Sequence, residues 1–308
     1  MKVLEVNNLS KGYRVNGKYF EAVRQVSLTL DQGEVLAFLG PNGAGKTTTI
    51  KTIAGLVEPN GGSVSVAGLN PHKNPQALRY VGAVLEGNRN LYWRLTSEEN
   101  LEYFGVLKGL TRRQARRKGR ELLERFELTP KRRTTVQMLS RGMQQKLAIA
   151  TALIHQPKLL LLDEPTLGLD VEATQTVKVL VKEIAQEGCA ILLTTHQLDI
   201  AEELSDRVAI IQNGKIIAQE STRDLIRSFS GTAYTIEIDS KLNELQQKAL
   251  ATLGGSQEGD NLLRIHGTEE LYQLLESLKP LPLVQIKQDS SDLTEVFLKI
   301  IQKTPQYD

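Results

Sequence analysis

Residues 40–48 read GPNGAGKTT, a glycine-rich segment that ends in a lysine and two threonines. The spacing fits G-x-x-x-x-G-K-[ST], between an apolar strand pattern at 35–39 and a stretch of helical periodicity. The backbone N–H groups of such a loop close around phosphate oxygens. Lys46 is expected to reach the terminal phosphates and Thr47 to contact Mg²⁺. The residues expected to bind nucleotide here are Gly40, Pro41, Asn42, Gly43, Ala44, Gly45, Lys46, Thr47 and Thr48.

A second candidate site lies at 158–165, KLLLLDEP, where an apolar run ends in two carboxylates. The run predicts a buried strand, so both acidic side chains would stand at its carboxyl end. Asp163 can bind Mg²⁺ directly or through water, and Glu164 is placed to orient or deprotonate an attacking water. An acidic turn without chemistry is the alternative, and the phosphate loop in the same chain argues against it.

His196 follows another apolar run, AILLTT at 190–195. A polar side chain at the carboxyl end of a parallel strand points into the crevice where ligands bind. His196 is therefore expected to hydrogen-bond the terminal phosphate or the attacking water. A purely structural histidine is the alternative.

The segment LSRGMQQKL at 139–147 raises the question of a second anion site. Ser140 and Gly142 precede a stretch of helical periodicity, and a helix N-terminus carries free N–H groups and a partial positive charge. A phosphate anchored at Lys46 has little use for a distant second helix N-terminus in its own chain. The motif alone therefore leaves open why one chain carries two anion sites.

The elements around these motifs alternate between strands and helices. Short apolar strand patterns separated by helical stretches predict a parallel α/β sheet. Residues 2–7 and 19–30 read as further strands, and residues 96–155 are mostly helical in pattern. Asn213-Gly214 is a strong turn signal within an apolar hairpin pattern.

The pattern changes after about residue 225. Residues 226–308 again alternate strand and helix patterns, which predicts a small separate α+β domain. The 308 residues suffice for one large and one small domain. We therefore expect domains at 1–225 and 226–308.

The composition is that of a soluble globular protein, with 40% hydrophobic and 24% charged residues. A net charge of +2, from 38 basic and 36 acidic residues, gives no general attraction to nucleic acid. Cys189 is the single cysteine, which excludes an internal disulfide and a zinc cluster and fits a reducing compartment. No apolar run approaches the roughly 18–20 residues that span a bilayer, and the N-terminus does not read as a signal peptide.

Together these motifs resemble those of the ATP-binding cassette (ABC) ATPases over residues 1–225. The resemblance rests on GPNGAGKTT, LSRGMQQ, LLLLDEP, LGLD at 167–170 and His196, in the order and spacing of the family. It implies a P-loop NTPase ABC cassette with a parallel-sheet core, an antiparallel β subdomain and a helical subdomain at about 88–155. The α+β domain at 226–308 would be a C-terminal accessory domain.

In this family two cassettes pair head to tail, and the phosphate loop of one and the signature of the other clamp the same ATP. The resemblance thus implies ATP and Mg²⁺ as ligands, and a second cassette as partner. Asp170 of LGLD would lie at the dimer interface. The signature residues that would act on the partner's ATP are Ser140, Arg141, Gly142 and Met143. The residues implied at the metal are Thr47, Asp163 and Glu86.

The chain departs from the family pattern at three positions. Arg141 stands where the commonest signature has glycine, and it excludes the most permissive backbone conformations. Met143 stands in place of a glutamine and cannot make its polar contact. Glu86 stands where the family usually has a glutamine that senses Mg²⁺ and contacts the transporter partner. A carboxylate can ligate Mg²⁺ but adds negative charge near the phosphates. We expect a working but altered half-site, with neutral drift as the alternative.

Tyr13 matches the position of the aromatic residue that stacks on adenine in this family. Tyr19 and Phe20 are rivals for that role, and an aromatic residue of the core is the alternative.

A basic segment at 111–133 reads TRRQARRKGRELLERFELTPKRR. Contact with anionic lipid or an acidic partner is one interpretation, and nucleic acid is another. Acidic residues interrupt the run and no interleaved aromatic residues support single-strand binding, so a solvated helical face is favoured.

The interpretation that unites these features is the ATP-hydrolysing subunit of an ABC transporter. It would lie on the cytoplasmic face of the membrane, bound to separate permease subunits, as a homodimer or heterodimer. LYWRLTSEENL and the terminal DLTEVFLKI resemble cassettes that serve separately encoded exporter permeases. The alternatives are a soluble ABC ATPase acting on ribosomes or DNA, and a regulatory module that binds ATP without turnover. The presence of both Glu164 and His196 argues against the module.

Overall fold

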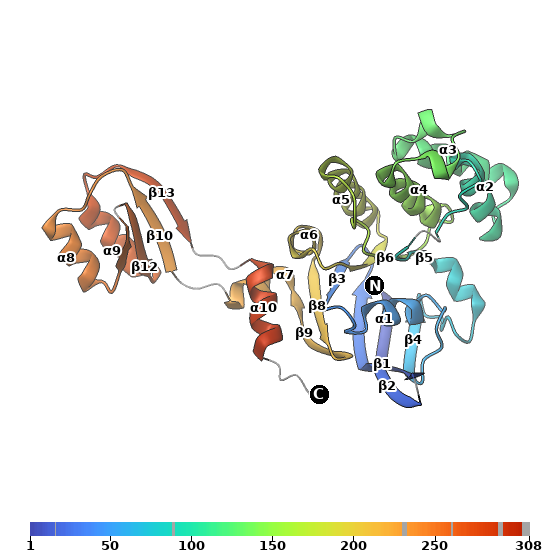
Figure 1. The fold of residues 1–308 in the computed structure, drawn as a ribbon, viewed down its shortest axis with the longest axis horizontal. Coiled ribbons are helices and arrows are strands. Elements are labelled where there is room, and N and C mark those ends of the chain that lie inside the picture. Colours follow the sequence, from blue (N-terminus) through green and yellow to red (C-terminus); the bar gives the residue numbers. More distant parts are fainter. Residues whose placement is uncertain (16, 88–89, 230–232, 260, 289–291, 304–308) are drawn as a thin grey trace. The chain divides into compact units, whose positions relative to one another are not determined.

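The computed structural model describes residues 1–15, 17–87, 90–229, 233–259, 261–288 and 292–303 (Figure 1). The chain divides into two compact units, with residues 223–298 forming the second and the end of the last helix, from Lys299, grouped with the first. The sequence-based boundary falls at 225/226 and assigns the whole of 226–308 to the accessory domain. The structure instead groups the end of that last helix, from Lys299, with the first unit.

A six-stranded sheet forms the centre of the first unit, in the order β5-β6-β7-β3-β8-β9. All neighbouring strands are parallel except β8 and β9, which form the predicted hairpin through Asn213-Gly214. Every residue of β3, β6 and β7 is buried, which explains why these strands read as continuous apolar runs. The strands are β3 (Val35–Leu39), β5 (Val81–Val84), β6 (Leu159–Asp163), β7 (Ala190–Thr194), β8 (Arg207–Gln212) and β9 (Lys215–Ser221).

A separate antiparallel sheet has the order β2-β1-β4. Its strands are β1 (Lys2–Val15), β2 (Lys18–Asp31) and β4 (Gly61–Val66). β1 is longer than the predicted strand at 2–7. Several register shifts interrupt its pairing with β2, so the two-residue alternation breaks down beyond the first half of the strand.

Helices cover the central sheet and build a lobe beside it (Figure 1). Thr96 and Thr111 each begin a helix of the lobe with a reciprocal capping box, which satisfies two backbone N–H groups at the start of the helix. The lobe contains α2 (Ser97–Leu107), α3 (Arg112–Arg125) and α4 (Arg141–Leu153). The other helices of this unit are α1 (Lys46–Ile53), α5 (Val171–Gln186) and α6 (Leu198–Leu204).

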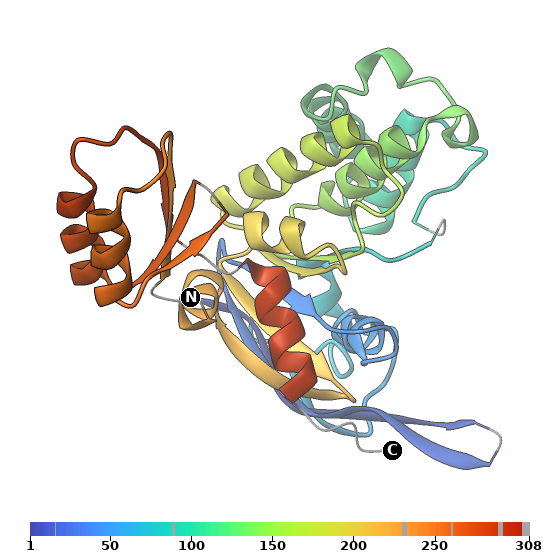
Figure 2. The same ribbon diagram turned by 60° about the vertical axis from the view of Figure 1, so that its left-hand side comes forward.

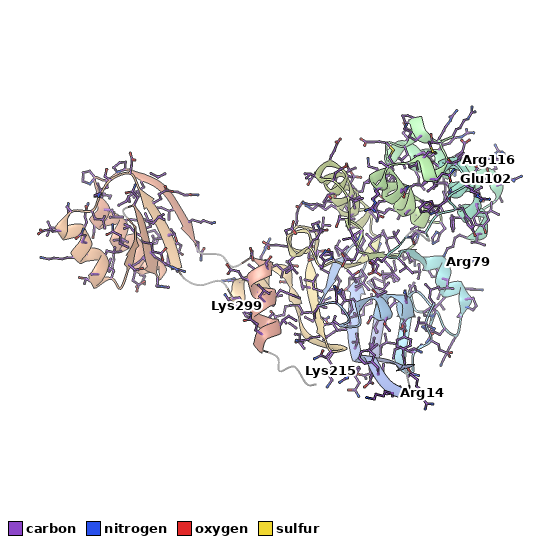
Figure 3. The ribbon with its side chains drawn as sticks, viewed as in Figure 1. Arg14, Arg79, Glu102, Arg116, Lys215 and Lys299 are labelled. Carbon is purple, nitrogen blue, oxygen red and sulfur yellow. The ribbon has the colours of Figure 1, made fainter. Side chains whose placement is uncertain are left out.

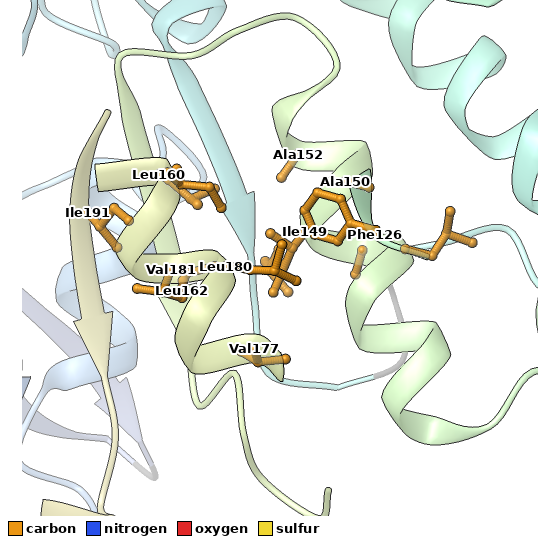
Figure 4. Close-up of a cluster of buried hydrophobic side chains, with 14 of the residues drawn as sticks. Phe126, Ile149, Ala150, Ala152, Leu160, Leu162, Val177, Leu180, Val181 and Ile191 are labelled. Carbon is orange, nitrogen blue, oxygen red and sulfur yellow. The ribbon is translucent and has the colours of Figure 1, made fainter. Parts of the chain in front are cut away.

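One apolar cluster joins the lobe to the sheet (Figure 4). Phe126 and Ile149 from the lobe pack with Leu160 and Leu162 of β6 and Val177 of α5, all of them almost inaccessible to solvent. Burial of each such side chain contributes roughly 1.5–3 kcal/mol. This cluster fixes the position of α4 relative to the strands that carry the acidic residues.

The second unit has the chain order β10-α8-β11-β12-α9-β13 and the sheet order β11-β12-β10-β13, with every pair antiparallel. This is the ferredoxin-like arrangement, with α8 and α9 on one face of the sheet (Figures 1 and 2). Its elements are β10 (Ala233–Ile238), α8 (Glu244–Thr252), β11 (Ser256–Glu258), β12 (Leu262–His266), α9 (Thr268–Leu278) and β13 (Leu283–Gln288). Two further helices lie at the ends of this segment, α7 (Thr222–Phe229) and α10 (Leu293–Lys303).

Removal of residues 226–308, which include the end of the last helix grouped with the first unit, is expected to leave the rest of that unit folded with unchanged nucleotide affinity. The two apolar clusters of that unit contain no residue after Ile216, and the second unit has an apolar cluster of its own. Thermal unfolding and equilibrium binding of a fluorescent ATP analogue measure both properties. An insoluble product, or one with nucleotide affinity reduced tenfold, would show that the first unit depends on the removed residues.

Candidate functional site

The glycine-rich loop connects β3 to α1 and leaves the N-terminus of this helix open. Gly45 occupies the N-cap position in a left-handed conformation, with φ at 108°, and no side chain caps the helix. A Cβ atom on Gly45 would lie 2.3 Å from the Ala22 carbonyl oxygen, so β2 leaves no room for a larger residue. The first N–H groups of α1 are therefore available to an anion.

Lys46 is buried at the start of α1, with an exposed fraction of 9%. Its Nζ donates hydrogen bonds to the carbonyl oxygens of Gly40, at 2.6 Å, and Pro41, at 3.2 Å. Burial lowers the pKa of the lysine, and the nearby carboxylates of Glu164, Asp163 and Glu86 act in the opposite direction. The ammonium group thus bonds the loop and is attracted by three acidic side chains.

Asp163 stands at the carboxyl end of β6 and is 3% exposed. The Thr194 hydroxyl, from the neighbouring strand β7, donates to its Oδ1 at 2.5 Å. Its Oδ2 is buried and has no partner among the described residues. A buried carboxylate oxygen without a partner is costly, so this atom fits a cation.

The donor set near Asp163 suits Mg²⁺ rather than a metal held by protein alone. Nowhere in the described part of the chain do three or more His, Cys, Asp or Glu side chains converge as metal ligands. Mg²⁺ characteristically takes one or two carboxylates together with water and substrate phosphates. Asp163 and the hydroxyl of Thr47, in the first turn of α1, are the protein groups that match this chemistry.

Glu164 and His196 form a hydrogen-bonded pair beside Asp163. The Nδ1 atom of His196 lies 2.9 Å from Oε2 of Glu164. The Glu164 side chain is 11% exposed and that of His196 is 54% exposed. Since β6 and β7 are neighbours, the two residues that follow them meet at the same edge of the sheet. The structure therefore brings together the two residues that the sequence analysis assigned to catalysis.

A cavity of about 610 Å³ borders Asp163 and Glu164. Glu86, Asp163, Glu164, Arg141 and Gly168 are among the residues that line it. Glu86 thus lines the same cavity as Asp163 and Glu164, and its role at the metal stays a prediction. Arg141 is the only one of the four predicted signature residues among the lining residues of this cavity.

The signature segment lies near the LGLD segment and α5 of the same chain, since a Cβ atom on Gly168 would lie 2.8 Å from Nη1 of Arg141. The Ser140 hydroxyl caps α4 by accepting from the N–H of Met143 at 3.3 Å. A Cβ atom on Gly142 would lie 2.7 Å from the Cβ of Ala173, so its lack of a side chain permits close approach to α5. Met143 packs against the apolar cluster of the lobe instead of facing solvent as a polar residue would.

Asp170 caps α5, because its Oδ1 accepts from the N–H of Ala173 at 2.8 Å. Its carboxylate is exposed, and its place at a dimer interface stays a prediction.

The three candidate stacking residues lie on the β1–β2 hairpin. Tyr13, Tyr19 and Phe20 are 38%, 62% and 53% exposed, so none of them is an aromatic residue of the core. Lys11 Nζ lies 5.3 Å from the centre of the Tyr13 ring. The choice among the three for adenine stacking stays a prediction.

The basic segment forms an ion-paired surface. Arg112 and Arg116 of α3 bind the carboxylate of Glu102 on α2, and the Arg116–Glu102 pair is labelled in Figure 3. Arg125 pairs with Glu183 of α5 and with Glu187, the residue that follows this helix. These contacts favour the solvated helical face over a nucleic-acid site.

Two residues escaped the sequence analysis. Thr194 donates a hydrogen bond to Asp163. The sequence feature that could have indicated this residue is a hydroxyl side chain near the end of the apolar run that precedes His196. Asn90 holds the loop that carries Glu86, accepting from the N–H of Leu85 at 3.0 Å and donating to the Leu85 carbonyl at 2.7 Å. Nothing in the local pattern marks Asn90 for this contact.

Comparisons with known proteins agree with this geometry. A family model described as ABC transporter matches residues 23–167. The chain is 37% identical over 227 residues to the ABC transporter ATP-binding protein NatA of Bacillus subtilis, covering 73% of this chain and 92% of NatA. It is 36% identical over 250 residues to the daunorubicin/doxorubicin resistance ATP-binding protein DrrA of Streptomyces peucetius. This match covers 81% of this chain and 73% of DrrA.

A similar solved structure is the dimeric, post-hydrolysis state of an ATP-binding cassette bound to ADP and Pi. The TM-score is 0.65 at 27% identity, and the match covers 71% of this chain and 99% of that one. The predicted α/β cassette fold is thereby confirmed. Among the described residues, no helix combines the length and apolar character needed to cross a bilayer.

Proposed function

Because this chain belongs to the ATP-binding subunits of ABC transporters, we propose that it hydrolyses ATP to power export through separate membrane subunits. Two copies, or this chain and a related cassette, would pair head to tail around ATP and Mg²⁺. The chain would then lie at the cytoplasmic face of the membrane, held there by its permease.

The hydrogen bond between Glu164 and His196 is the observation that carries the proposed hydrolysis. In the tautomer whose Nδ1–H donates to Glu164, the other ring nitrogen of His196 accepts a hydrogen bond from the attacking water, and it donates to the terminal phosphate only when the ring carries a second proton. Glu164 then takes a proton from that water as its oxygen attacks the γ-phosphorus, while the bond to the bridging oxygen breaks and ADP leaves. Lys46 and the open N-terminus of α1 hold the phosphate oxygens, and bound Mg²⁺ would neutralise developing charge on them.

Replacement of Lys46 by alanine is expected to weaken ATP binding about ten- to a hundredfold. The variant loses a charge-assisted contact to phosphate, a bond typically worth about 1.5–3 kcal/mol. Equilibrium titration with a fluorescent ATP analogue measures the loss. Lys51→Ala, at an exposed lysine of the same helix, is the matched control. Equal affinity of the two variants would contradict the phosphate-loop assignment.

The proposal of export rests on similarity to resistance proteins such as DrrA. Purification of the tagged chain from membranes, with identification of the bound membrane subunits, tests the assembly. Reconstituted vesicles should then show ATP-dependent transport that stops with Glu164→Gln. If the chain instead purifies with ribosomes or DNA and is absent from the membrane fraction, the result would favour the soluble alternative. The similarity of this chain to transporter subunits argues against the soluble alternative.

A further inference from the structure

Asn90 uses its whole side-chain amide to hold the backbone that follows β5. Its Oδ1 accepts from the N–H of Leu85 at 3.0 Å, and its Nδ2 donates to the carbonyl oxygens of Leu85 at 2.7 Å and Gly87 at 3.2 Å. The opposite orientation of the amide would place its donors against an N–H and its oxygen against two carbonyl oxygens. The site therefore requires an amide, with one acceptor and two donors in these places.

Glu86 is the residue that these bonds enclose. β5 is an edge strand of the central sheet, and its pairing with β6 runs to Val84. Beyond Val84, the Asn90 amide bonds both backbone groups of Leu85, as a neighbouring strand would do. The Leu85 carbonyl belongs to the peptide group that leads into Glu86. Its bond to Asn90 therefore helps to set the direction in which the Glu86 side chain leaves the backbone.

The Glu86 side chain has a reason to turn away from the site unless its backbone is held. It is exposed, and it lines the same cavity as the carboxylates of Asp163 and Glu164. Like charges repel, so the two other acids favour a Glu86 side chain that points into solvent. Glu86 nevertheless acts to raise the pKa of Lys46, which places its charge within reach of the phosphate loop.

We propose that Asn90 is a positioning residue for Glu86, and that its amide keeps the Glu86 carboxylate where it can bind the Mg²⁺ that accompanies ATP. This inference rests on the proposed function, which brings ATP and Mg²⁺ to this cavity. Asn90 acts only through Glu86 and does not itself bind the metal. Side chains that orient a metal ligand typically contribute ten- to a hundredfold to metal affinity.

Mg²⁺-dependent binding of a fluorescent, non-hydrolysable ATP analogue tests this role without turnover. Asn90→Ala should raise the Mg²⁺ concentration for half-maximal binding about tenfold. Asn90→Asp should do the same, because it keeps an acceptor for Leu85 but loses both donors. In EDTA, both variants should bind the analogue as the wild type does, which also shows that they are folded. Asn74→Ala, which removes an asparagine that accepts from the N–H of Gln76, is the matched control and should behave as the wild type.

A double variant separates positioning of Glu86 from a general loosening of the backbone. Glu86→Ala alone should raise the half-maximal Mg²⁺ concentration about tenfold or more. Asn90→Ala added to Glu86→Ala should change it by less than about twofold, because the two residues act as one unit.

Four outcomes would overturn this inference alone. They are an unchanged Mg²⁺ requirement in Asn90→Ala, no effect of Glu86→Ala, additive effects in the double variant, and an equal loss of binding in EDTA. If the wild type binds the analogue neither with Mg²⁺ nor without it, the proposed function fails and this inference fails with it.

Discussion

Glu164→Gln is expected to lower ATP hydrolysis by about 10²–10⁴-fold, the usual contribution of a general base, while ATP affinity stays within threefold of the wild type. The amide cannot take a proton from water, whereas the loop at 40–48 and Lys46 are unchanged. His196 would then face an amide in place of the carboxyl group that lies 2.9 Å from Nδ1 in the wild type. Phosphate release and equilibrium nucleotide binding are the two measurements.

Because ATP would then persist, the same variant should form a dimer that needs ATP and appears in gel filtration. Glu124→Gln makes the same chemical change at an exposed position of α3 and should behave as the wild type does. Wild-type turnover by Glu164→Gln would remove Glu164 from the catalytic role. A complete loss of ATP binding would instead show that Glu164 acts mainly in holding nucleotide.

The groups expected to carry the chemistry were predictable because their signals are local. A glycine-lysine pattern between a strand and a helix, and carboxylates at the end of an apolar run, each fit within ten residues. The neighbouring β6 and β7 then bring Asp163, Glu164 and His196 to one edge of the sheet. Short buried strands of α/β proteins generally pair in parallel. The meeting of these three residues at one edge could therefore also be predicted from the sequence pattern.

The contacts that support the site were not predictable, because they join residues distant in the sequence. The hydrogen bond from Thr194 to Asp163 depends on which strands are neighbours. The place of Arg141 beside Gly168 depends on how α4 packs near α5. The ferredoxin-like order of the second unit has the same cause, since alternating patterns identify strands but not their partners.

Ser140 shows how one residue can have a local and a distant role at once. Its hydroxyl caps α4 in its own chain, and the proposed dimer assigns it to the ATP of the partner. A substitution at Ser140 therefore changes helix stability as well as nucleotide contact. Ser140→Ala isolates the capping effect, which is about 1 kcal/mol for a typical cap.

Ser140→Arg is expected to leave ATP binding by the monomer unchanged and to abolish dimerisation and hydrolysis. The arginine side chain would fill the seat of the partner's phosphate, and the cap would be lost as in Ser140→Ala. If the loss of activity came from the cap alone, Ser140→Ala would be equally inactive. Monomer affinity is measured by equilibrium binding, and turnover by phosphate release.

Mixing two inactive variants separates the one-chain and two-chain arrangements. In a dimer of Ser140→Arg with Lys46→Ala, one composite site joins an intact Lys46 to an intact Ser140, and the other site carries both defects. ATP-dependent pairing should return in part, and hydrolysis should return if one good site suffices. If Ser140→Arg instead removes ATP binding from the isolated monomer, both anion sites act on one nucleotide within one chain. The head-to-tail dimer would then be wrong for this protein.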